Sequence, residues 1–180
     1  MLAIKFTKRR DGSIISRFER ADGTATWQRK DGPQANFFAA HDLTHYAIET
    51  TLFYRRGFYG LVAEGWDLSD FGTPWPRGPL PVDAEPAELI AGLLDGERAA
   101  GERCSAEEFN EKIALYYETH GLADPPTLTQ EQLDRIRKFA SELRARWAAV
   151  SLGDSLELTF DPNREPGTDG PQNNSKGRKN

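Results

Sequence analysis

The sequence predicts a single α+β domain in which a small antiparallel sheet packs on about four helices. Segments with strand-like alternation of apolar residues stand near both ends of the chain, within residues 1–30 and 155–160. The chain between them shows helical periodicity and helix-capping motifs. With 180 residues and a hydrophobic fraction of 38%, the chain is long enough for one domain with a proper core.

The first strands are predicted from three short runs, residues 2–7, 13–18 and 24–27. Each run is followed by an Asp-Gly pair, and such pairs favour tight hairpin turns in which both central residues take positive φ. The three pairs are Asp11-Gly12, Asp22-Gly23 and Asp31-Gly32. We therefore predict that the three runs form an antiparallel meander. Residues 156–160 alternate in the same way as residues 2–6, so we expect a last strand that returns to this sheet.

The segment from residue 36 to residue 55 is apolar nearly all round, which predicts a central helix. A short second helix is expected near residues 61–67. The prolines in residues 73–81 are incompatible with a helix or a central strand, so this stretch should form an extended surface loop. Asp83 is expected to cap a third helix that continues through residues 89–94.

Two capping boxes predict the remaining helices. They are Ser105-x-x-Glu108 and Thr129-x-x-Gln132. The helix that begins at the second box carries apolar residues at spacings of three and four up to Val150, with charged pairs outside. Residues 161–180 contain no large apolar side chain, and we predict a disordered tail there, which leaves residues 1–160 as the domain.

Composition excludes several classes of function. A net charge of -5 and a pI near 5.3 leave no basic field for nucleic acid. No apolar stretch approaches the length that spans a bilayer, and no signal peptide begins the chain, so we expect a cytoplasmic protein without a membrane partner. Cys104 is the single cysteine, which excludes an internal disulfide and a thiolate metal cage. The oligomeric state is not predicted.

The predicted central helix contains four ionisable residues within its apolar pattern: His41, Asp42, His45 and Glu49. Burying such groups without partners costs several kcal/mol, so something nearby must compensate them. Two histidines four residues apart on one helix face can reach the same metal ion. The sequence therefore indicates a metal site, with zinc as the preferred ion.

A third ligand should come from another element, and Glu64 in the next apolar segment is the candidate. Glu49 lies eight residues beyond His41, about 12 Å along a helix axis, and therefore fits support of His45 better than a shared ion. The choice between Glu49 and Glu64 as third ligand stays open. Asp42 is also placed to support an imidazole.

The pattern His41-Asp42-Leu43-Thr44-His45 followed by Glu64 resembles the gluzincin group of zinc metallopeptidases, over residues 41–67. In that family an H-E-x-x-H helix and a Glu from a following helix bind zinc. The resemblance implies that His41, His45 and Glu64 are ligands and that Asp42 occupies the position of the catalytic base, where the family has Glu. It also implies an outer role for Asp67.

The leading hypothesis is a divalent-metal, zinc-binding protein that acts as a metal-dependent hydrolase through a metal-bound water. Its substrate would be a small molecule or a peptide. The alternative is a non-enzymatic structural or interaction module in which the two histidines belong to the core. The sequence contains no phosphate loop, dinucleotide fingerprint or nucleophile elbow that would narrow the reaction or the substrate further.

Overall fold

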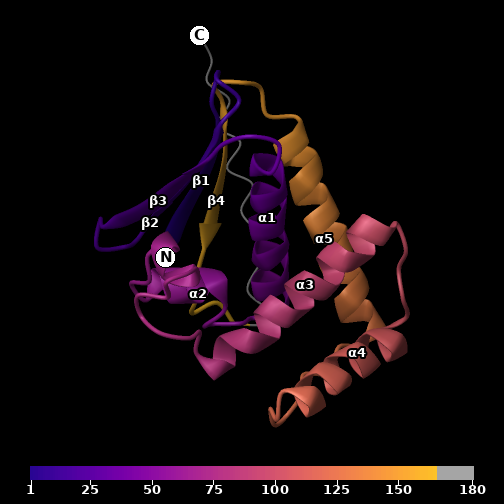
Figure 1. The fold of residues 1–180 in the computed structure, drawn as a ribbon. Helices are drawn as coiled ribbons and strands as arrows, with labels where there is room; N and C mark the ends of the chain where they lie inside the picture. Colours follow the sequence, from indigo (N-terminus) through magenta and orange to yellow (C-terminus); the bar gives the residue numbers. More distant parts are fainter. Residues whose placement is uncertain (166–180) are drawn as a thin grey trace.

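The computed structural model describes residues 1–165 and has the predicted α+β architecture. The sheet has the order β3-β2-β1-β4, and every neighbouring pair is antiparallel. Its strands are β1 (Leu2–Lys8), β2 (Ile14–Glu19), β3 (Ala25–Lys30) and β4 (Ser155–Phe160). The C-terminal strand therefore returns beside the first one, as predicted (Figure 1). The predicted tail lies outside the described residues from position 166 onward.

The Asp-Gly turns differ from the expected type. In the first two hairpins only the glycine takes positive φ, at Gly12 and Gly23, while the aspartate does not. The Asp11 carboxylate instead accepts hydrogen bonds from the backbone amide and the hydroxyl of Ser13, at 3.0 and 2.7 Å. The side chain thus completes a turn longer than the two-residue hairpin. The prediction that both central residues take positive φ was wrong.

Five α-helices and two short 3-10 helices connect β3 to β4 in the described part of the chain. The α-helices are α1 (Ala35–Leu52), α2 (Phe58–Ala63), α3 (Glu85–Ala100), α4 (Ala106–Thr119) and α5 (Gln130–Ala148), and the 3-10 helices are η1 (Leu68–Phe71) and η2 (Val82–Ala84). Both capping boxes form as predicted. Asp83 does not cap α3, because it lies in η2 and pairs with Arg56 at 2.6 Å.

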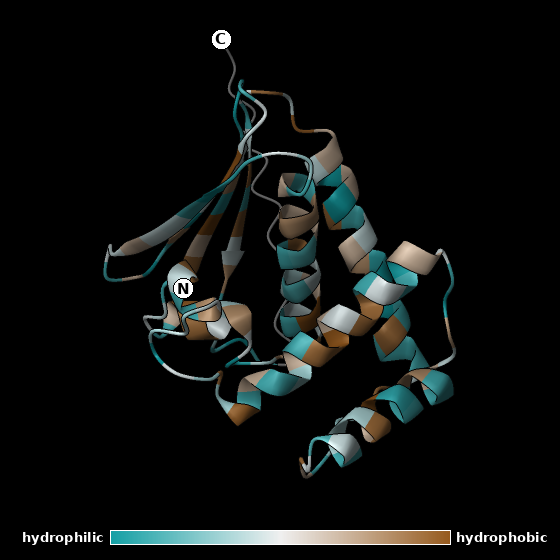
Figure 2. Cartoon of the chain, in the orientation of Figure 1, coloured by the Kyte–Doolittle hydropathy of each residue, from teal (hydrophilic) through white to brown (hydrophobic). Residues whose placement is uncertain are grey.

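The helices lie on one side of the sheet, where α1 packs against both α3 and α5 and α4 packs against α3 (Figure 1). Aromatic rings join the layers: Phe6 meets Trp147 of α5 with ring centroids 6.2 Å apart, and Phe18 meets Tyr59 of α2 at 5.5 Å. Hydrophobic and hydrophilic residues alternate along α3, α4 and α5, as expected of helices that bury one face (Figure 2). No helix within residues 1–165 has the length and apolar character needed to cross a membrane.

The N-terminal cap of α5 offers a test of local stability. The Thr129 hydroxyl accepts the Gln132 amide at 3.1 Å, and the Gln132 side chain accepts the Thr129 amide at 2.8 Å. Thr129→Ala removes one of these acceptors, so we expect the free energy of unfolding to fall by about 1 kcal/mol. Urea denaturation measures it. Ser141→Ala, on the exposed side of the same helix, should change stability by less than about 0.5 kcal/mol, and an equal loss in both variants would contradict the capping role.

Candidate metal centre

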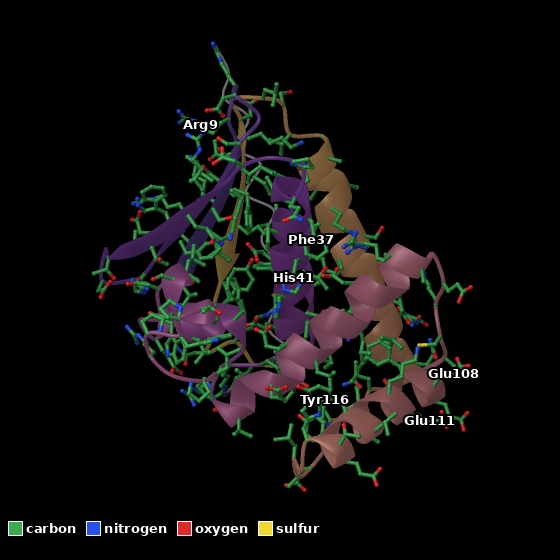
Figure 3. All side chains as sticks on the ribbon, in the orientation of Figure 1. Arg9, Phe37, His41, Glu108, Glu111 and Tyr116 are labelled. Atoms are coloured by element: carbon green, nitrogen blue, oxygen red, sulfur yellow. The ribbon has the colours of Figure 1, made fainter. Side chains whose placement is uncertain are left out.

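Two imidazoles from α1 and one carboxylate from α3 converge on a common point. His41 and His45 lie one turn apart, and their Nε2 atoms are 3.2 Å from each other. Glu88 Oε2 lies 3.6 Å from His45 Nε2. One ligand atom from each residue lies within 4.8 Å of the other two, so this group could hold a metal ion. Figure 3 shows His41 on α1 near the place where α3 crosses it.

Two of the three separations between ligand atoms match those that a small ion requires. Zinc binds imidazole nitrogen and carboxylate oxygen at about 2.0–2.2 Å, and a tetrahedral site with such bonds separates neighbouring ligand atoms by about 3.3–3.6 Å. The observed 3.2 and 3.6 Å are close to this range. All three ligand atoms lie within 4.8 Å of one another, so a closer approach of His41 and Glu88 would bring them around one ion.

Asp95, also on α3, fixes the orientation of His41. Its Oδ2 lies 2.7 Å from His41 Nδ1, and its Oδ1 accepts a hydrogen bond from the Arg98 guanidinium at 3.3 Å. Burial alone would lower the pKa of His41, but the hydrogen bond with Asp95 and the charge of Asp42 raise it above its ordinary value. In the neutral imidazole, a carboxylate on Nδ1 keeps the proton there and leaves the Nε2 lone pair free for a ligand bond.

His45 is buried and neutral. Its imidazole is only 2% exposed, and burial lowers its pKa to about 4. A neutral imidazole is the form that binds metals. Its second nitrogen, Nδ1, lies 3.7 Å from Glu49 Oε1 and has no hydrogen-bond partner among residues 1–165.

Glu49 is engaged mainly with the backbone at the start of α2. Its carboxylate accepts the amides of Tyr59 at 3.1 Å and Gly60 at 3.3 Å, and burial raises its pKa to about 8. Glu49 lies beside His45 without a hydrogen bond to it, because 3.7 Å is too long, and its support of His45 stays a prediction. Glu49 is not a member of the three-residue group.

Asp42 is buried beside the group without belonging to it. Burial raises its pKa to about 7, and Oδ2 has no hydrogen-bond partner in the described part of the chain. Its backbone carbonyl accepts the Tyr59 hydroxyl at 3.0 Å, which ties α2 to this turn of α1. The catalytic role of Asp42 stays a prediction.

The structure does not bring Glu64 or Asp67 to the imidazoles. Helix α2 is six residues long, and Glu64 follows its last residue with a side chain that is 45% exposed and accepts the Arg56 guanidinium at 2.9 Å. Asp67 pairs with Arg20 at 2.8 Å. Glu88 occupies the place that was expected for Glu64, because α2 is too short and turns its terminal carboxylate toward a nearby guanidinium.

Glu88 and Asp95 were missed because they lie more than 40 residues beyond His45 in the chain. A signal was nevertheless present. The two acids are seven residues apart, which is two helical turns, and therefore share a helix face with the small residue Ala91 between them. Ala91 is fully buried and Ala87 is almost fully buried. Small side chains such as these allow two helices to approach closely.

Comparison of the chain with protein-family models, curated proteins and solved structures finds no match. The geometry and chemistry of this group of residues are therefore the basis for assigning a function.

Proposed function

We propose that this protein binds one divalent transition-metal ion, with zinc preferred, through His41 Nε2, His45 Nε2 and a carboxylate oxygen of Glu88. The observation that supports this proposal is the convergence of three ligand atoms from two helices within 4.8 Å of one another, with two of the separations close to those of a tetrahedral site. Two histidines and one glutamate form a donor set that catalytic zinc uses.

The chemistry proposed for the site is metal-dependent hydrolysis. Three protein ligands leave one position of a tetrahedral ion for water, and zinc lowers the pKa of such a water to about 7. The side chains of His41 and Glu88 are 29% and 30% exposed, so solvent and a substrate can reach this side of the group. Asp42, whose pKa of about 7 suits proton transfer, is the proposed base.

A metal-free role is the second candidate. The 3.2 Å between the two Nε2 atoms is also a hydrogen-bond length, and with Asp95 on His41 Nδ1 the side chains could form a chain of hydrogen bonds that fastens α1 to α3. The protein would then be a non-enzymatic structural or interaction module.

Metal content separates the two candidates. Protein purified without a metal-affinity column and dialysed against zinc should retain about one equivalent of zinc by elemental analysis. His120→Ala is the matched control, since His120 is an exposed residue at the end of α4 that lies outside the group. It should retain the same amount. A wild-type protein that keeps no stoichiometric transition metal would overturn the proposal.

Asp95→Asn tests the support of His41. The substitution keeps the shape of the side chain but removes the charge that holds the Nδ1 proton, so we expect the affinity for zinc to fall about 10- to 100-fold. Competition with a chromogenic chelator measures the change. Asp83→Asn removes a charge that pairs with Arg56 only and serves as the control. Equal affinities in the two variants would contradict a supporting role for Asp95.

A further inference from the structure

A pocket of about 250 Å³ lies beside the metal centre, between α3, α5 and the segment that follows α3. Its charged lining consists of four arginines and two glutamates, which leaves a net charge of +2. The residues are Arg98, Arg103, Arg137, Arg144, Glu97 and Glu102. Such an excess of guanidinium groups around a cavity is unusual for a chain whose net charge is -5.

Two of the arginines are already paired. Arg137 is buried and donates to both oxygens of Glu97, at 2.5 and 3.0 Å, and Arg98 donates to Asp95. Arg103 and Arg144 have no ion-pair partner among residues 1–165. Burial and the charges of Arg98 and Arg103 lower the pKa of Arg144, although Asp95 opposes this effect. These positive charges therefore lie close enough to repel one another.

Two contacts join this pocket to the metal centre. Arg144 donates to the Thr44 hydroxyl at 3.4 Å, and Thr44 stands between the two histidines on α1. Arg98 reaches Asp95, which in turn holds His41. Arg98 also lies over the ring of Phe37 at 5.6 Å. Phe37 stands one turn before His41 on α1 (Figure 3). The pocket therefore neighbours the Nδ1 side of His41, and none of its lining residues belongs to the three-residue group.

We propose that this pocket binds the phosphate group of a phosphate monoester. A phosphate monoester carries a charge of about -1.5 to -2 at pH 7, which complements the excess of +2 in the lining. Its oxygens accept from guanidinium forks in two-pronged geometry, and Arg103 and Arg144 have donors to spare. This inference goes beyond the proposed function and does not depend on it.

The test titrates inorganic phosphate into the full-length, metal-free protein at constant ionic strength and follows the heat of binding. Wild-type protein should show saturable binding with one site. Arg144→Gln and Arg103→Gln should each weaken the affinity about ten-fold or more, since each removes a charged donor. Arg146→Gln, on the exposed face of the same helix and outside the pocket, should bind as the wild type does.

A parallel titration with acetate shows whether the pocket prefers a phosphate or a carboxylate. Acetate that binds as tightly as phosphate would overturn the phosphate assignment, and unchanged phosphate affinity in both Arg144→Gln and Arg103→Gln would overturn the location. Arg103 is exposed, so its variant tests the pocket even if Arg144→Gln fails to fold. Zinc content is measured in parallel. A wild-type protein that binds no phosphate but retains zinc in a separate zinc-dialysed sample defeats this inference alone, whereas one that binds phosphate but retains no zinc in that sample defeats the proposed metal function alone.

Discussion

Replacement of both His41 and His45 by alanine is expected to abolish zinc binding. The wild type should retain about one equivalent, and the double variant should retain none, because a lone carboxylate cannot hold zinc against competition from water. The loss should exceed the roughly 10- to 100-fold change expected when only a supporting partner is removed. Two measurements report the loss of zinc binding: elemental analysis after dialysis, and competition with a chelator.

The third ligand is tested by a pair of matched substitutions. Glu88→Gln should weaken zinc binding by more than about 100-fold, since Glu88 Oε2 stands 3.6 Å from His45 Nε2. Glu64→Gln should leave the affinity unchanged, because that carboxylate pairs with Arg56. The reverse result would restore Glu64 as the ligand. Circular dichroism of each variant shows whether the helices persist, so that loss of metal is not confused with loss of fold.

Gly60→Ala is expected to produce the largest loss of stability. A Cβ at this position would lie 1.9 Å from the backbone carbonyl oxygen of Arg55, and a backbone atom cannot move aside as a flexible side chain can. Overpacking of this kind costs about 3 kcal/mol of the free energy of unfolding. Urea denaturation measures the change.

Gly92→Ala is the matched control for this glycine. Gly92 lies in α3 with no atom within 4 Å of a built Cβ, so alanine should stabilise the helix by about 1 kcal/mol. A Gly60→Ala variant as stable as the wild type would mean that the turn between α1 and α2 relaxes easily. In that event the Gly60 amide would not be held rigidly against Glu49.

Residues close together in the chain determined much of the fold. The alternation of Leu2, Ile4 and Phe6 indicated a strand with one buried face, and all three are buried. The boxes at Ser105 and Thr129 predicted where two helices begin, because a capping side chain satisfies amides only two or three residues away. Turn geometry was less predictable, since Asp11 could satisfy its turn in more than one way.

The sequence by itself also determined half of the candidate site. Four-residue spacing on a helix brings His41 and His45 together whatever surrounds them, and the structure places their Nε2 atoms 3.2 Å apart. The choice of the partner carboxylates was decided only by tertiary structure. Glu88 and Asp95 reach the imidazoles because α3 packs across α1, whereas Glu64, much nearer in the chain, is held by Arg56. The physical reason is that helical periodicity acts over a few residues, whereas the contact between α1 and α3 depends on how all the buried faces pack together.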